Sequence, residues 1–107
     1  MLEKKNQQYF NKIIMRHYPT LTNHFLHRQW ERKVDSYQLR KILDQIKFDL
    51  KHFSGFLLIG NSILKKAEIK ANKTLILRLD NGKLITLFYE RNLYPFLQKT
   101  KGQSIIL

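Results

Sequence analysis

Two short basic segments contain the side chains with the clearest potential for chemistry. Residues 63–73 read ILKKAEIKANK, and residues 24–33 read HFLHRQWERK. Their candidate binding residues are Lys65, Lys66, Lys70, Lys73, Arg28, Arg32 and Lys33. Cations that contact phosphates release the counterions condensed on nucleic acid, and this release favours binding that weakens with salt. Both segments therefore predict contacts with a nucleic-acid backbone, although lysines on an edge strand also prevent edge-to-edge aggregation.

The positive charge extends over the whole chain. Its 107 residues include 20 Lys and Arg against 8 Asp and Glu, which gives a formal net charge of +12 and a pI near 10.1. The first half, 1–53, has 11 basic and 5 acidic side chains, and the second half, 54–107, has 9 and 3, so each half carries +6. Such a pI in a small domain is typical of nucleic-acid binding. A lysine-rich genome is the alternative explanation.

The segment TLILRLDNGKLITLFYERN, residues 74–92, predicts a β-hairpin. Asn81-Gly82 is the residue pair that best tolerates the two positive φ angles of a two-residue turn. In that register Asp80 opposes Lys83 and Leu79 opposes Leu84. The alternative is a three-residue loop at 80–82 with a bulge, which would turn the second strand over.

The favoured hairpin register has one apolar face and one mixed face. The apolar face comprises Leu75, Leu77, Leu79, Leu84, Thr86 and Phe88. The mixed face comprises Ile76, Arg78, Ile85, Leu87 and Tyr89. Either a C-terminal segment covers part of the mixed face, or the face is a platform for bases and phosphates. The second possibility adds Arg78, Lys83, Tyr89 and Arg91 to the predicted nucleic-acid-binding residues, with Tyr94 as a further stacking candidate.

The sequence predicts no catalytic residue, no metal and no cofactor. Cysteine is absent, and His24 and His27 would supply only two of the three or four ligands that zinc needs. The acidic residues are scattered, and none of the common nucleotide-binding or hydrolase motifs is present. The longest central apolar run, 56–59, is far shorter than the roughly 20 residues of a membrane span, and the N-terminus lacks the apolar core of a signal peptide. We therefore expect a cytoplasmic protein with no membrane partner.

Helical periodicity dominates the first half of the chain. We expect helices at 3–17, from Thr20 or Thr22 to about residue 33, and from an N-cap at Asp35 to Ser54-Gly55. Asp35 and Gln38 have the spacing of a capping box. The inward residues of the second helix are predicted to be Leu21, Phe25, Leu26 and Trp30. Those of the third are predicted to be Leu39, Ile42, Leu43, Ile46, Leu50 and Phe53.

The second half of the chain favours strands. Strands are expected at 56–59, 63–71, 74–79 and 83–89, with a final strand at the C-terminal SIIL; residues 93–99 are either a short helix or a loop. The predicted fold is a single α+β domain over residues 1–107. In it, two to three N-terminal helices (the helical part, 1–53) pack on a small antiparallel sheet of three to five strands (54–107).

These observations favour a small, non-enzymatic accessory protein that binds DNA or RNA through the backbone, within a larger protein complex. Three alternatives stay open. A helix-turn-helix would place 36–51 in the major groove, and an adaptor would dock an acidic protein. The third alternative rests on a resemblance: two helices followed by a basic antiparallel sheet are loosely similar to metal-independent ribonuclease toxins of the RelE/HigB type. That resemblance implies cleavage by Lys, Arg, His or Tyr side chains, although such toxins usually begin with a strand rather than a helix.

A second resemblance concerns the order of the strands. A long bent strand, two more strands, a short helix near 93–99 and a returning strand follow the order of an OB-fold. This chain would provide only four of its strands, so the resemblance implies an incomplete barrel or one completed by a partner.

Overall fold

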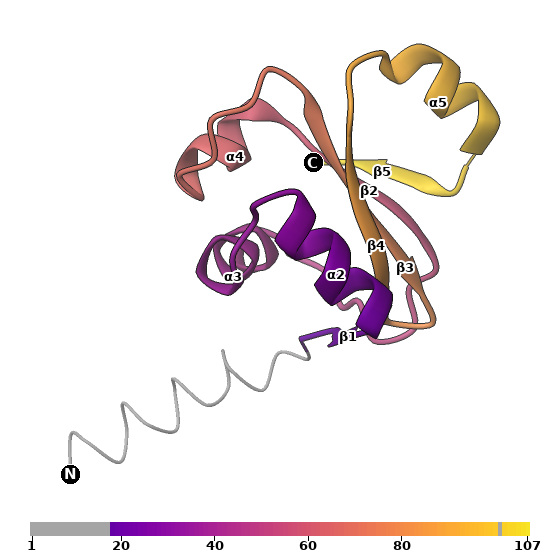
Figure 1. Cartoon of the computed structure of the whole chain (residues 1–107). Coiled ribbons are helices and arrows are strands. Elements are labelled where there is room, and N and C mark those ends of the chain that lie inside the picture. The colour runs from indigo at the N-terminus through magenta and orange to yellow at the C-terminus, as the bar shows by residue number, and fades with distance from the viewer. Residues whose placement is uncertain (1–17, 101) are drawn as a thin grey trace, which may run out of the picture.

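A computed structural model describes residues 18–100 and 102–107, and the predicted first helix at 3–17 lies outside them. A five-stranded sheet lies at the centre of the described chain, with helices on both sides (Figure 1). In chain order the elements are β1 (Thr20–Leu21), α2 (Asn23–Glu31), α3 (Ser36–Asp44), β2 (Gly55–Ile59), α4 (Asn61–Lys66), β3 (Thr74–Asp80), β4 (Lys83–Glu90), α5 (Leu93–Thr100) and β5 (Ser104–Ile106). None of the helices described is long and apolar enough to cross a membrane.

The predicted antiparallel sheet packed under N-terminal helices is wrong. The strand order is β1-β4-β3-β2-β5, and the sheet is mixed: β3 is antiparallel to β2 and β4, while β1 is parallel to β4 and β5 is parallel to β2. The helices are interspersed with the strands. Parallel pairing needs a crossover connection, and α5 lies on the connection that carries the chain from β4 across to β5 at the far edge.

Helix α4 replaces the strand predicted at 63–71. The backbone of Gly60 is extended and precedes the first turn, so the presumed break at 60–62 starts a helix. Leu64 and Ala67 are buried at a helical spacing of three residues. The two lysines between them, Lys65 and Lys66, are exposed.

Helix α3 has the predicted N-terminus but a different end. The amide of Gln38 donates to Asp35 Oδ1 (2.8 Å), and the amide of Asp35 donates to Gln38 Oε1 (3.0 Å), which confirms the capping box. The helix stops at Asp44 instead of continuing to residue 54, because the amides of Gln45 and Ile46 bond to carbonyls three residues back and tighten the last turn. The apolar residues 46 and 50 are still buried, but an irregular segment presents them.

Helix α2 begins at the predicted N-cap but is rotated relative to the prediction. Thr22 Oγ1 accepts the amide of Phe25 (3.1 Å) and also lies 3.1 and 3.2 Å from the carbonyl oxygens of residues 84 and 85 on β4. These contacts fix the helix on the sheet so that Phe25 and Gln29 are buried. The predicted inward orientation of Leu26 and Trp30 is wrong, because their side chains are 47% and 78% exposed.

The hairpin has the predicted two-residue turn. Asp80 pairs with Lys83, and Asn81 and Gly82 adopt φ angles of 48° and 78°. A Cβ at Gly82 would lie 2.1 Å from the carbonyl oxygen of Lys51, so a glycine is needed there.

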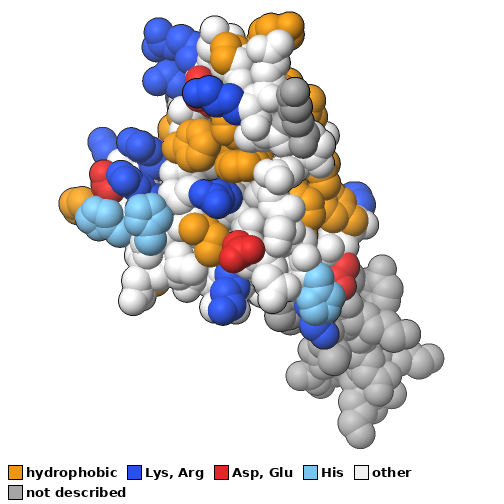
Figure 2. All heavy atoms as spheres, turned by 90° about the vertical axis from the view of Figure 1, so that its right-hand side faces the viewer, with side chains coloured by type: hydrophobic (Ala, Val, Ile, Leu, Met, Phe, Trp, Pro, Cys, Tyr) orange, Lys and Arg blue, Asp and Glu red, His pale blue; other side chains and the backbone are white. Residues whose placement is uncertain are grey.

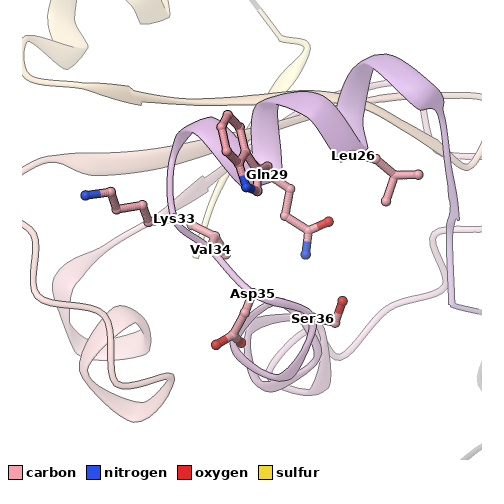
Figure 3. Close-up of a pocket in the computed structure, with 7 residues that line it drawn as sticks. Leu26, Gln29, Lys33, Val34, Asp35 and Ser36 are labelled. Atoms are coloured by element: carbon pink, nitrogen blue, oxygen red, sulfur yellow. The ribbon is translucent and has the colours of Figure 1, made fainter.

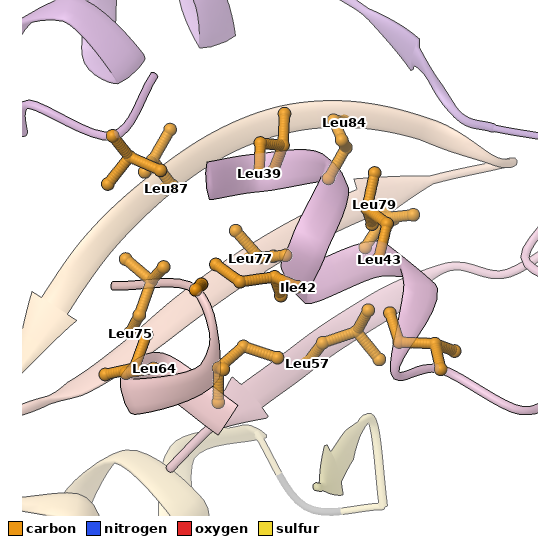
Figure 4. Close-up of a cluster of buried hydrophobic side chains, with 14 of the residues drawn as sticks. Leu39, Ile42, Leu43, Leu57, Leu64, Leu75, Leu77, Leu79, Leu84 and Leu87 are labelled. Carbon is orange, nitrogen blue, oxygen red and sulfur yellow. The ribbon is translucent and has the colours of Figure 1, made fainter. Parts of the chain in front are cut away.

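A bulge at Ile85 exchanges the two faces of β4 beyond the turn. Leu79 pairs with Leu84, but Arg78 already pairs with Thr86, so Ile85 has no ladder partner. As a result Leu87 is in the core (Figure 4). Phe88 lies on the opposite face, where it packs against Phe96, so the two residues are placed in reverse of the prediction. A bulge adds one residue to one strand, and every later side chain therefore changes side.

The two faces of the sheet are covered unequally. The main hydrophobic core lies between the sheet and α2, α3 and α4 (Figures 1 and 4). On the other face α5 places Phe96 edge-on against Phe56 and Phe88, with ring centroids 5.1 and 5.9 Å apart. Arg78 stacks over Phe56 at 5.7 Å and is exposed. A C-terminal helix thus covers part of the sheet face that carries Arg78, Phe56 and Phe88.

Candidate nucleic-acid interface

A basic pocket of about 390 Å³ brings the two basic segments of the sequence together. It lies where the end of α2, the connection from α4 to β3 and the end of β4 meet. We call it the basic pocket; its lining residues are Arg32, Lys33, Gln38, Glu68, Ile69, Lys70, Ala71, Asn72, Lys73 and Tyr89. Four of these carry positive charge and one carries negative charge. No ion pair joins any of the four cations to a carboxylate within the described ranges.

The end of α2 places Lys33 in the pocket through a Schellman motif. The amide of Val34 donates to the carbonyl of Gln29 (3.1 Å), and the amide of Lys33 donates to that of Trp30 (3.2 Å). Lys33 occupies the left-handed position that usually holds glycine, with φ 57°. Val34, the next residue, is buried and anchors the turn in the core.

The end of α4 repeats this geometry on the other side of the pocket. The amide of Ile69 donates to the carbonyl of Leu64 (2.8 Å), and that of Glu68 donates to Lys65 (3.0 Å). Glu68 occupies the left-handed position with φ 61°, and Ile69 is the buried anchor. Left-handed backbone is uncommon outside glycine, and such residues often gather at functional sites. Two of them line this pocket.

Gln38 connects the helices around the pocket. Its Oε1 accepts the amide of Asp35, and its Nε2 donates to the carbonyl of Glu68 (3.2 Å). One side chain therefore closes the N-terminus of α3 and holds the turn that follows α4. This positioning residue is absent from the predicted binding set, although its place in the capping box was recognisable in the sequence.

Tyr89 forms one wall of the pocket. It is half-buried and packs against the main core. Burial raises the pKa of its phenol, and the nearby positive charge of Arg32 opposes that rise. The hydroxyl therefore keeps its proton at neutral pH and can donate a hydrogen bond to an anion. Because the ring packs against the core, Tyr89 is better suited to this role than to the predicted stacking.

A flanking pocket of about 370 Å³ extends the basic surface. It is lined by Asn61, Lys65, Ile69, Lys70, Ala71 and Asn72. Residues 69–72 belong to both pockets, so Lys70 lies between them. Lys65 thereby joins the same surface. Asn72, absent from the predicted set, adds an amide that can bond to phosphate or sugar.

The remaining predicted residues do not line the basic or the flanking pocket. Arg78 stacks on Phe56, on the side covered by α5, and Lys83 pairs with Thr20 at the turn end of the hairpin. Arg28 forms an ion pair with Glu31 (3.1 Å). The others that lie outside these pockets are Lys66 on α4, Arg91 just after β4 and the exposed Tyr94 on α5.

Figure 2 shows the α5 side, where hydrophobic side chains lie between groups of Lys and Arg side chains that gather toward one edge of the view. Among the predicted residues, five cations line the two adjoining pockets: Arg32, Lys33, Lys65, Lys70 and Lys73.

Comparison with protein-family models, curated proteins and solved structures gives no match to this chain. No group of three or more His, Cys, Asp or Glu side chains that could hold a metal ion occurs within residues 18–100 and 102–107.

Proposed function

We propose that the protein binds nucleic acid through the phosphate backbone, and that the basic pocket is the main contact. The observation that carries this proposal is the convergence of Arg32, Lys33, Lys70 and Lys73 from separate segments around one cavity. A phosphate there would meet ammonium and guanidinium groups that have no carboxylate partner in the described chain. We further propose an accessory role within a larger protein complex in the cytoplasm.

The backbone of the pocket explains why the cations are needed. The pocket is formed at the C-terminal ends of α2 and α4, and helix C-termini carry partial negative charge. The bare backbone would therefore repel phosphate. The Schellman bonds satisfy terminal carbonyls, while the cations reverse the sign of the local potential. Binding should accordingly depend on these side chains and fall steeply with salt.

The test is the salt dependence of binding to a labelled oligonucleotide, measured by fluorescence anisotropy. A pocket variant combines Arg32→Gln, Lys70→Gln and Lys73→Gln. Its plot of log K against log salt should be shallower than that of the wild type by about 2 to 3 in slope, since each lost phosphate contact removes about 0.7–0.9. The matched control, Arg78→Gln with Lys83→Gln and Lys99→Gln, removes the same charge elsewhere.

The proposal fails if the two triple variants lose affinity equally, because net charge would then explain binding without a pocket. It also fails if the wild-type chain does not bind. Polyglutamate serves as a competitor in the same assay. If it displaces the oligonucleotide at equal charge concentration, the pocket is better described as a docking site for an acidic protein.

Ribonuclease activity is a second candidate, favoured by one observation. Tyr89 lies in the basic pocket beside Arg32, and burial raises the pKa of its hydroxyl, so a proton donor and a phosphate-polarising cation share one site. Incubation of an RNA oligonucleotide in EDTA tests it. Cleavage abolished by Tyr89→Phe would establish the activity, and intact RNA would exclude it under those conditions.

A further inference from the structure

A third pocket adjoins the basic pocket and differs from it in character. We call it the Trp30 pocket; it has a volume of about 510 Å³ and is lined by Leu26, Gln29, Trp30, Lys33, Val34, Asp35 and Ser36 (Figure 3). It lies between the last turns of α2 and the start of α3. Figure 3 shows the side chains of Leu26 and Gln29 directed toward α3, with Ser36 opposite them.

Two large apolar side chains that line the Trp30 pocket are exposed to solvent. Trp30 is 78% exposed and Leu26 is 47% exposed, and the four-residue spacing puts them on one side of α2. The core beneath is already closed by Phe25 and Val34, so folding does not require the indole. Exposed apolar patches on soluble proteins often mark binding sites.

Lys33 lines both the Trp30 pocket and the basic pocket. Residues 69–72 in turn connect the basic pocket to the flanking pocket. The three pockets therefore lie in series, with lining residues shared between neighbours, and we call this series the track. An aromatic ring lies at one end, and the cations follow from Lys33 to Lys65.

Charge separates the two parts of this track. The Trp30 pocket contains the carboxylate of Asp35, which already accepts the amide of Gln38 and therefore stays in place as the helix cap. A fixed carboxylate disfavours a phosphate in this pocket. A nucleic-acid base is therefore the group that suits the indole in this pocket, while the phosphates suit the basic pocket on the other side of Lys33.

We propose that the ligand of this track is single-stranded nucleic acid, with one unpaired base stacked on Trp30 and the adjoining phosphates in the basic pocket. This inference rests on the proposed function and specifies its substrate class. In a duplex the faces of the bases are stacked on one another and only their edges are accessible. An exposed indole can stack only on an unpaired base or a strand end.

The chain has one tryptophan and five tyrosines, so fluorescence excited selectively at the indole reports on the Trp30 pocket. Titration with oligo(dT) should quench this fluorescence, and a duplex of equal length should quench it much less. Trp30→Ala should weaken binding to oligo(dT) by about 5- to 150-fold, the range expected for one stacked base. Trp30→Phe should recover part of the loss.

Tyr37→Ala is the matched control, because Tyr37 is a 58% exposed aromatic residue on α3 that does not line the pocket. Unchanged urea midpoints would confirm that each variant folds. Equal affinity of Trp30→Ala and wild type for oligo(dT), or tighter binding of the duplex, would overturn the inference. If the pocket variant with the Arg32, Lys70 and Lys73 substitutions still loses affinity in that case, nucleic-acid binding through the basic pocket stands. Only the preference for single strands is then wrong.

Discussion

The C-terminal ends of α2 and α4 have the same construction but opposite charge. Each ends in a Schellman motif, and each places a non-glycine residue in left-handed backbone, Lys33 in one and Glu68 in the other. Each is followed by a buried aliphatic anchor. The two left-handed residues, Lys33 and Glu68, both line the basic pocket. The comparison separates two properties of the pocket: the backbone geometry is common to both ends, whereas the electrostatic preference depends on which side chain each end presents.

The largest expected effect concerns the buried anchor of the α4 end. Ile69→Ala should lower the free energy of unfolding by about 2–4 kcal/mol, since it leaves a cavity beneath the turn. Ile69→Val should cost only about 0.5–1.5 kcal/mol. Val34→Ala at the α2 end removes fewer carbons and should cost about 1.5 kcal/mol. Urea unfolding measures all three; an Ile69→Ala cost below that of Ile69→Val would show that the α4 turn is not anchored in this way.

The second prediction separates geometry from charge. Lys33→Gly and Glu68→Gly should each stabilise the fold by about 1 kcal/mol, because glycine adopts left-handed backbone without the penalty of a Cβ. Their effects on oligonucleotide binding should be opposite. Lys33→Gly removes a cation and weakens binding, whereas Glu68→Gly removes the carboxylate of the pocket and strengthens it.

The controls for this pair are Lys33→Gln and Glu68→Gln, which change charge but keep a side chain in the strained position. They should reproduce the binding changes without the gain in stability. Thermal unfolding and anisotropy titrations at one salt concentration give the two readouts. If both glycine variants changed affinity in the same direction, backbone rigidity rather than charge would control binding.

The sequence predicted the local features of this region better than their arrangement. The capping box of α3, the N-cap of α2 and the two-residue hairpin turn depend on residues a few positions apart, and all three are confirmed. The bulge at Ile85 was not predicted; Thr22, more than sixty residues away, lies against the carbonyls of residues 84 and 85 there, a contact that local spacing does not reveal. The change of face at Leu87 and Phe88 follows from that bulge.

The candidate site was predicted only in part, because charge patterning is local in the sequence whereas the pockets combine distant segments. Charge patterning identified Arg32, Lys33, Lys70 and Lys73, which line one pocket. It also selected Arg78 and Lys83, which do not line the pocket. Arg78 lies on β3 over Phe56, and Lys83 lies at the turn end of the hairpin, and these positions depend on strand pairing, which charge patterning does not predict. Trp30 was assigned to the core because Leu26 and Trp30 have helical spacing. Phe25 and Gln29 have that spacing too, and they are the pair that is buried in the structure.

Gln38 provides the third prediction, because it connects the two helix ends through α3. Gln38→Ala removes its bonds to Asp35 and to the carbonyl of Glu68, and should cost about 1 kcal/mol. Gln38→Glu keeps the acceptor for Asp35 but lacks the donor to Glu68, and adds a negative charge to the pocket. It should lose less stability than Gln38→Ala and yet bind an oligonucleotide more weakly, a combination that chemical denaturation and anisotropy together would detect or refute.

The smallest expected effect concerns the ionisation of Tyr89 beside the α2 end. Burial raises the pKa of this phenol and the positive charge of Arg32 opposes the rise, so Arg32→Gln should raise the pKa further. Since the folded-state pKa is raised, the neutral phenol's contribution to stability is complete below about pH 10 and is lost as the pH rises through the folded-state pKa. In Arg32→Gln this loss should extend to higher pH. Absorbance at 295 nm, taken as the difference from matched Tyr89→Phe variants, isolates this group from the other tyrosines. A Tyr89 titration unchanged by Arg32→Gln would show that the guanidinium does not act on the phenol, and would count against Arg32 as a cation directed into the pocket.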